Sequence, residues 1–125
     1  MTIQKVHEII DNMHNENMNI WKDLVRQPSV SSNHEQVRKC AEMLVEIMES
    51  SGIETQIFET EGNPLVYGEI KSGQKDSPTL LFYGHYDVQP PEPLELWDSP
   101  PFEPEIRNGR LYGRGTGDNK GQLLT

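Results

Sequence analysis

Apolar positions recur at helical spacing through the first part of the chain. Apolar residues three or four positions apart run through residues 2–26 and predict an amphipathic helix. A second stripe predicts a helix at about residues 33–51, where Ser32 and Glu35 match a capping box. Gly52 would end this helix in a left-handed conformation. The chain is therefore expected to begin with two helices.

Shorter apolar runs follow and predict strands at residues 54–60, 65–70 and 79–83. The third run is apolar on both faces, so we expect it to be the most central strand. Prolines throughout residues 89–104 exclude regular helix and central strand, and Asn108-Gly109 then predicts a type I′ hairpin turn. Two helices followed by strands indicate an α/β fold with helices covering a sheet.

Length and charge narrow the classes of function. The 125 residues fit one modest domain, and 11 basic against 20 acidic side chains give a net charge of −9. This charge argues against nucleic acid or an anionic membrane as partner. The N-terminus lacks the apolar core of a secretion signal, and no run is long enough to span a membrane. The single cysteine, Cys40, is expected as a packed thiol and is consistent with the reducing cytoplasm.

The end of the third predicted strand carries a possible metal-binding pair, His85 and Asp87. Side chains two residues apart in a strand point to the same side. His85 could therefore bind zinc while Asp87 orients its ring, and Gly84 would allow close approach of the metal. The same two residues also fit an ordinary hydrogen bond at a strand end. The pair by itself leaves both interpretations open.

A second carboxylate, Asp118, follows a turn in which every second residue of 113–117 is glycine. Such a turn can hold a carboxylate close to another strand end, and a carboxylate can bridge two divalent cations. A phosphate-binding loop is excluded, because the glycine spacing stops at Asp118 and Lys120-Gly121 reverses the order of a Walker loop.

Other residues near these segments allow two interpretations each. Trp97 and Phe102 fit equally the lining of a substrate pocket and the anchoring of the proline-rich loop. Arg114 and Lys120 fit contacts with a substrate carboxylate, but structural hydrogen bonds with the turn are favoured. The remaining histidines are expected at the surface: His7, His14 and His34.

These segments together resemble a known family, the co-catalytic zinc exopeptidases and deacylases. The matching segments are Pro28–Ser31, Leu81–Pro90, Trp97–Phe102, Gly109–Gly115 and Asp118–Gly121. The family includes carnosine-type dipeptidases, aminoacylase, acetylornithine deacetylase, succinyl-diaminopimelate desuccinylase and glutamate carboxypeptidase. The resemblance covers essentially the whole chain. It implies that residues 1–125 are the N-terminal part of a three-layer α/β/α catalytic domain with a mixed sheet.

The resemblance also implies roles for individual residues. His85 matches a zinc ligand, Asp87 the catalytic aspartate held against that imidazole, and Asp118 the carboxylate that bridges two zinc ions, with cobalt or manganese as alternatives. The Asp118-Asn119 peptide bond is expected to be cis, as in these enzymes. Many dipeptidase-like relatives have an acid where this chain has the amide of Asn119.

The complete enzyme would hydrolyse amide bonds in dipeptides or N-acyl amino acids. The resemblance leaves two oligomeric states open for it, a monomer and a homodimer. Its general-base glutamate, its remaining metal ligands and its lid or dimerisation domain are expected outside residues 1–125. The chain alone is therefore expected to be inactive, with a weak or empty metal site. The alternative, from another functional class, is a truncated, non-catalytic remnant that acts as a binding or interaction domain.

Overall fold

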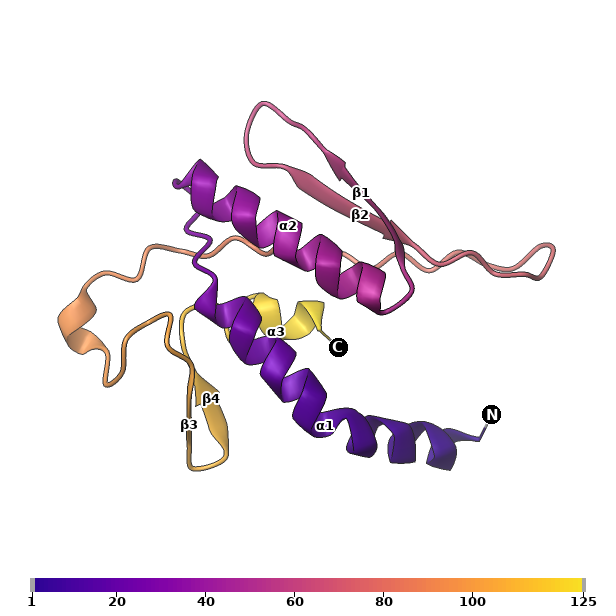
Figure 1. Ribbon diagram of the computed structural model, residues 1–125, viewed down its shortest axis with the longest axis horizontal. Helices are drawn as coiled ribbons and strands as arrows, with labels where there is room; N and C mark the ends of the chain where they lie inside the picture. The colour runs from indigo at the N-terminus through magenta and orange to yellow at the C-terminus, as the bar shows by residue number, and fades with distance from the viewer. Residues whose placement is uncertain (1, 125) are drawn as a thin grey trace.

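The computed structural model describes residues 2–124, which form two long helices, two small hairpins and a short C-terminal helix (Figure 1). The elements in chain order are α1 (Ile3–Arg26), α2 (His34–Ser50), β1 (Glu54–Phe58), β2 (Leu65–Glu69), the 3-10 turn η1 (Leu94–Leu96), β3 (Glu105–Arg107), β4 (Arg110–Tyr112) and α3 (Lys120–Leu123). The predicted α/β class is confirmed. No helix in the described part of the chain is long and apolar enough to cross a membrane.

Both predicted helices are present, but α2 begins differently from the prediction. Its N-cap is Asn33, whose side-chain oxygen accepts a hydrogen bond from the amide of Gln36 at 3.1 Å. The predicted capping box is therefore wrong, because Ser32 lies one residue too early and Glu35 pairs with Lys39 instead. The predicted left-handed residue after the helix is confirmed, since Gly52 has φ +80.

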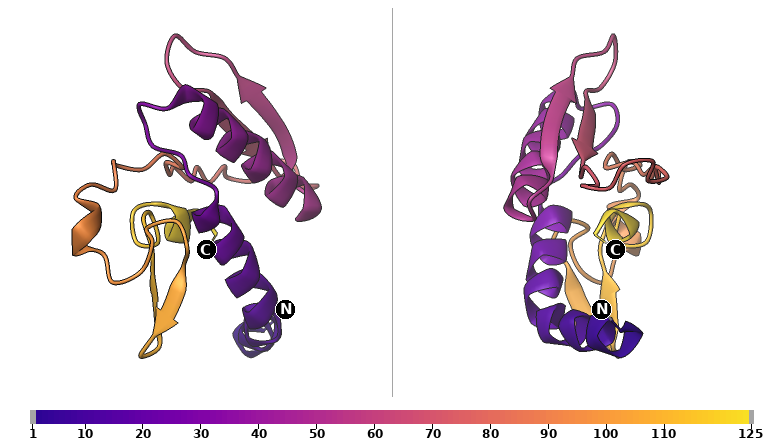
Figure 2. Two further views of the ribbon diagram at one scale, coloured as in Figure 1. Left: turned by 60° about the vertical axis from the view of Figure 1, so that its left-hand side comes forward. Right: turned by 90° about the vertical axis from the view of Figure 1, so that its right-hand side faces the viewer.

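The two hairpins lie at opposite ends of the molecule (Figures 1 and 2). β1 and β2 pair antiparallel, and α2 packs on both strands. Gly68 in β2 permits this approach, because a Cβ there would lie 2.2 Å from the Met48 side chain of α2. In the β3–β4 hairpin, Asn108 and Gly109 have φ 52 and 73, which confirms the predicted type I′ turn.

The predicted third strand is absent from the structure. Residues 79–83 pair with no strand among the described residues, and Leu80, Leu81, Phe82 and Tyr83 are 78%, 88%, 87% and 91% exposed. A strand forms only when neighbouring strands accept and donate its backbone hydrogen bonds. The apolar pattern indicates that this segment is suited to a buried strand, but the described residues provide it with no partner.

The core forms where the C-terminal end of α1, the helix α2 and the residue Val88 meet. Its buried apolar side chains are Leu24, Val25, Val37, Cys40, Ala41, Leu44 and Val88. A parallel bridge joins Val88 to Val30, with Val88 N donating to Ser29 O at 2.9 Å and Ser31 N donating to Val88 O at 3.0 Å. This bridge connects the α1–α2 linker to the segment that carries His85 and Asp87.

The proline-rich loop, residues 89–104, contains only the short η1 turn, as predicted. Trp97 braces the loop internally, because its ring nitrogen donates to the oxygen of another loop residue, Pro91 O, at 2.7 Å. Leu94 and Leu96 are exposed and do not anchor the loop. Prolines have no backbone N–H to donate, so regular backbone hydrogen bonding is interrupted in this loop. The side-chain hydrogen bond of Trp97 stabilises the loop instead.

Candidate metal centre

The structure brings the three predicted site residues together. His85 and Asp87 lie just before Val88, and Asp118 lies on the glycine-rich turn before α3. His85 Nε2 and Asp118 Oδ1 are 2.9 Å apart, although 33 residues separate them. All three residues line one cavity of about 410 Å³. Their roles in metal binding and catalysis stay predictions, but the proximity that those roles require is present.

The second nitrogen of the His85 ring faces Asp87. Nδ1 lies 3.0 Å from Asp87 O and 3.2 Å from Asp87 Oδ1, and both atoms can only accept, so Nδ1 carries a proton. Burial of the ring disfavours its positive charge, but the hydrogen bonds to Asp87 and Asp118 outweigh burial and raise the pKa of His85. The Nε2 edge of the ring is thereby directed at Asp118, in the orientation that a metal ligand needs.

Ser31 fixes the carboxylate of Asp87 from the other side. Its hydroxyl donates to Asp87 Oδ2 at 2.6 Å, while Ser29 donates to Tyr86 O at 2.6 Å. Ser31, Asp87, His85 and Asp118 therefore form a continuous chain of polar contacts. The sequence offered Ser31 only as part of a motif, because its 56-residue separation from Asp87 conceals the contact.

Asn119, which follows the candidate ligand Asp118, supports the backbone of His85. Its Oδ1 accepts from His85 N at 3.3 Å, a bond that an amide and a carboxylate can both accept. The Asp118-Asn119 bond is cis, as predicted. A Cβ on Gly84 would lie 2.7 Å from Asn119 Oδ1 and 2.5 Å from Leu123 Cδ2. The glycine thus provides space for these side chains, whereas the sequence had suggested space for a metal.

The two basic residues of the turn differ. Lys120 is fully buried, and its Nζ donates to Leu24 O at 2.9 Å and to Gln27 O at 2.6 Å. Burial lowers the pKa of Lys120. The favoured structural role is therefore confirmed for Lys120, but its side-chain hydrogen bonds go to the end of α1 and not to the turn as predicted. The predicted hydrogen bonds are wrong for Arg114, whose side chain makes none with a described residue and lies over the Trp97 ring, 5.1 Å from its centre.

The other candidates lie outside the cavity. His7, His14 and His34 are exposed, as predicted, and His34 Nδ1 lies 2.9 Å from Asn63 Oδ1. Cys40 is buried, and burial raises the pKa of its thiol, which confirms a packed role. Within residues 2–124, no three His, Cys, Asp or Glu side chains are grouped as a metal site. The chain therefore brings two ligand-type side chains together, His85 and Asp118.

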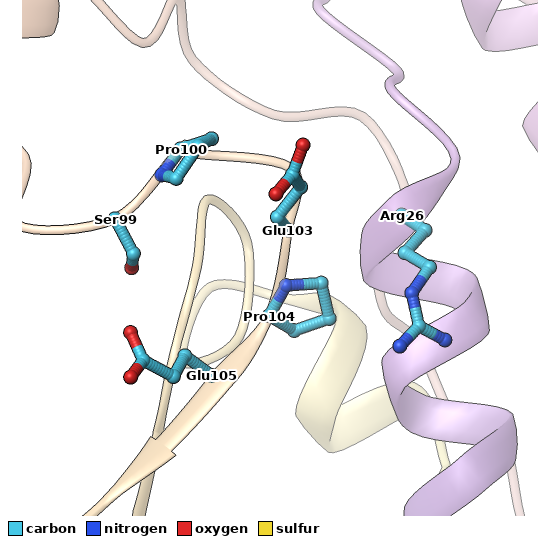
Figure 3. Close-up of a pocket in the computed structure, with 6 residues that line it drawn as sticks. All are labelled: Arg26, Ser99, Pro100, Glu103, Pro104 and Glu105. Carbon is cyan, nitrogen blue, oxygen red and sulfur yellow. The ribbon is translucent and has the colours of Figure 1, made fainter.

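A second cavity, of about 460 Å³, lies between the end of α1 and the residues that lead into β3 (Figure 3). Arg26 lines one side and Glu103 and Glu105 line the other, together with Ser99, Pro100 and Pro104. Arg26 already pairs with Asp23 at 2.5 Å on its own helix. None of the predicted site residues lines this cavity, so its larger volume does not make it the candidate site.

Comparison with known proteins supports a common family. Residues 81–125 match the family model described as peptidase family M20/M25/M40. Succinyl-diaminopimelate desuccinylase of Methylococcus capsulatus is 38% identical over 105 residues, which cover 81% of this chain and 25% of that protein. The chain thus spans about a quarter of the length of this curated relative.

Solved structures share the fold as well. The dipeptidase Dug1p from Saccharomyces cerevisiae has a TM-score of 0.86 at 26% identity, over 98% of this chain and 29% of that chain. The M20 family metallo-carboxypeptidase Sso-CP2 from Sulfolobus solfataricus has a TM-score of 0.81 at 39% identity, over 87% of this chain and 25% of that chain. In sequence and in fold, this chain is therefore related to the N-terminal part of the peptidase domains of family M20/M25/M40.

Proposed function

We propose that this chain is the N-terminal part of the catalytic domain of a metal-dependent hydrolase that cleaves amide bonds in dipeptides or N-acyl amino acids. The observation that carries the proposal is the contact of His85 Nε2 with Asp118 Oδ1 at 2.9 Å in a cavity, with Asp87 behind the ring. The names of the relatives, a desuccinylase, a dipeptidase and a metallo-carboxypeptidase, support hydrolysis of an amide bond.

The donor atoms of this pair suit zinc. A cation would replace the proton that His85 Nε2 shares with Asp118 Oδ1. With Nδ1 still protonated toward Asp87, the neutral ring would then offer its Nε2 lone pair to the cation, and Asp118 would offer a carboxylate oxygen beside it. Cobalt and manganese accept the same ligand types. We therefore propose that His85 and Asp118 would help to hold two zinc ions in the complete enzyme, and that further ligands would come from outside residues 1–125.

In the proposed reaction, the residues of this chain bind the metal and orient its ligands. A bound divalent cation supplies Lewis acidity that polarises an amide carbonyl and acidifies water. Asp87 holds the Nδ1 proton of His85 and thereby fixes its tautomer, while Ser31 keeps Asp87 in place. Asn119 fixes the backbone of His85. The proton of the attacking water would pass to a general base that we place outside this chain.

Zinc binding by the purified chain tests the assignment. We expect weak binding, lost in His85→Ala and in Asp118→Ala because each removes a ligand, and weakened about 10- to 100-fold in Asp87→Ala, which removes the orienting contact. Competition with a chromophoric chelator measures these affinities. His34→Ala is the matched control, since His34 is an exposed histidine outside the cavity. Unchanged zinc affinity in the first two variants would rule out the proposed ligands.

A further inference from the structure

The loop between β1 and β2 reaches the support of the candidate metal centre through one side chain, that of Asn63. Its Nδ2 donates to Ser31 O at 3.0 Å, and its Oδ1 lies 2.9 Å from His34 Nδ1. One amide group therefore contacts the α1–α2 linker and the first residue of α2 at the same time. Asn63 lies outside the lining of the cavity, so any effect on the site has to pass through the residues that it holds.

Asn63 belongs to a loop that is itself closed by hydrogen bonds. The Thr60 hydroxyl donates to Asn63 O at 2.7 Å and accepts from Gly62 N at 3.0 Å. The Tyr86 hydroxyl donates to Pro64 O, which joins the next loop residue to the segment of the candidate ligands. Because the loop is ordered, the Asn63 side chain loses little further conformational entropy when it makes its two contacts.

The position of the Ser31 backbone decides which acceptor its hydroxyl can reach. Ser31 N donates to Val88 O at 3.0 Å, and among the described residues Asn63 supplies the donor to Ser31 O. The hydroxyl oxygen lies 2.6 Å from Asp87 Oδ2 and 3.1 Å from Val88 O, so its single proton has two acceptors within reach. A small movement of the linker would change how the proton is divided between them. The contact of Asn63 with Ser31 O therefore bears on the hydrogen bond that fixes Asp87.

We propose that Asn63 is a positioning residue of the metal centre. It holds Ser31, whose hydroxyl fixes Asp87, and Asp87 in turn orients the His85 ring. The inference rests on the proposed function, because it extends the support of a proposed zinc ligand to the β1–β2 hairpin. Asparagine suits this place, since its amide offers a donor to Ser31 O and an acceptor to His34, whereas aspartate lacks the donor.

Nitrogen-15 NMR of the metal-free chain, with labelled histidine and at one fixed pH, tests the proposal without zinc. The ring-nitrogen shifts of His85 report the hydrogen bond between Nδ1 and Asp87. We expect Asn63→Ala to shift the Nδ1 resonance of His85, because Asp87 loses its fixed position, and Ser31→Ala to shift it as well. His34→Ala should leave the resonance in place, since it removes the other contact of Asn63 and keeps the one to Ser31 O.

A double-mutant cycle separates positioning from a general loss of stability. If Asn63 acts through the Ser31 hydroxyl, the double variant of Asn63→Ala and Ser31→Ala should show the same His85 shift as Ser31→Ala alone. Thr55→Val is the matched control for the hairpin, because it removes a hydroxyl that ties the same hairpin to α2 through Glu49 Oε1 at 2.8 Å. This control should leave the His85 resonance unchanged.

Zinc affinity, measured by competition with a chromophoric chelator, gives the functional readout. We expect Asn63→Ala to weaken zinc binding about 3- to 10-fold, less than Asp87→Ala, because it loosens the carboxylate without removing it. Asn63→Asp has the same shape and loses only the donor, so it should shift the His85 resonance in the same way. It replaces Asn63→Ala if that variant does not fold.

An unchanged His85 resonance in the Asn63 variants, or additive shifts in the double variant, would overturn the proposal. If the shifts respond as expected but the unmodified chain binds no zinc, the proposed hydrolase function fails while Asn63 keeps its positioning role. If zinc binding is lost in His85→Ala but is the same in Asn63→Ala as in the unmodified chain, this inference fails and the hydrolase function stands.

Discussion

Lys120 shows how a single side chain can join the candidate site to the core. Its ammonium group lies against the main-chain oxygens of Leu24 and Gln27 at the C-terminal end of α1, where a positive charge is favourable. Its stem packs near Gly115, where a Cβ would lie 3.4 Å from Lys120 Cδ. Because Lys120 follows Asp118 by two residues, the contact ties the turn that carries this carboxylate to α1.

Lys120→Met should therefore destabilise the fold. Methionine fills a similar volume but leaves one buried and one partly buried carbonyl group without this donor, so we expect the free energy of unfolding to fall by about 1–3 kcal/mol. Chemical denaturation followed by circular dichroism measures this loss. Lys75→Met is the control, because Lys75 is exposed and its removal should leave stability unchanged. Equal midpoints and slopes for Lys120→Met and the unmodified chain would contradict the structural role.

At the scale of elements, the start of α2 depends on one side chain. The side-chain oxygen of Asn33 accepts a hydrogen bond from the backbone N–H of Gln36, and the backbone N–H of Asn33 donates to Val30 O at 2.7 Å. Asn33 therefore ends the linker that carries Ser31 and begins the helix that contributes four core residues, Val37, Cys40, Ala41 and Leu44. Local spacing predicted that a helix starts here, but the backbone geometry decided which of two adjacent polar residues caps it.

A pair of neighbouring substitutions separates the observed cap from the predicted one. Asn33→Ala removes the hydrogen bond to an otherwise unpaired helical amide, so we expect it to cost about 1 kcal/mol of stability. Ser32→Ala should be nearly neutral, because Ser32 is exposed and outside the cap. Thermal unfolding of both variants measures the difference. A larger loss in Ser32→Ala than in Asn33→Ala would restore the capping box that the sequence suggested.

At the scale of the whole molecule, the apolar run Leu80–Tyr83 lacks both burial of its side chains and, among the described residues, a strand partner for its backbone. Its side chains are 78–91% exposed, and its backbone groups pair with no described strand. An extended apolar segment with free backbone donors and acceptors readily pairs with another chain. The chain spans about a quarter of the length of the desuccinylase and of Sso-CP2.

We expect the purified chain to self-associate through this run. Phe82→Glu should lower the association, because it places a charge in the middle of the apolar segment and repels a second copy. Sedimentation velocity over a range of concentrations measures the effect. Gln74→Glu adds the same charge at an exposed polar position and should leave association unchanged. A monomeric unmodified chain, or equal association of Phe82→Glu and the unmodified chain, would contradict the prediction.

Features that depend on neighbouring residues could be predicted from the amino-acid sequence. Periodicity predicted α1 and α2, the Asn108-Gly109 turn predicted the β3–β4 hairpin, and the glycine spacing predicted a turn before Asp118. These features are local, because hydrogen bonds within a helix or a tight turn join residues a few positions apart. His85, Asp87 and Asp118 were also identified as site candidates, by their residue types and the family resemblance.

Contacts between distant segments could not be predicted from the sequence and are set by the folded chain. It placed Ser31 against Asp87, Asn119 against the backbone of His85, and Lys120 against the end of α1. Among residues 2–124 it also left Arg114 Nε without a hydrogen-bond acceptor and residues 79–83 without a strand partner. A sequence pattern shows which environment a residue is suited to, but whether a donor, an acceptor or a neighbouring strand is available depends on segments that meet only when the chain folds.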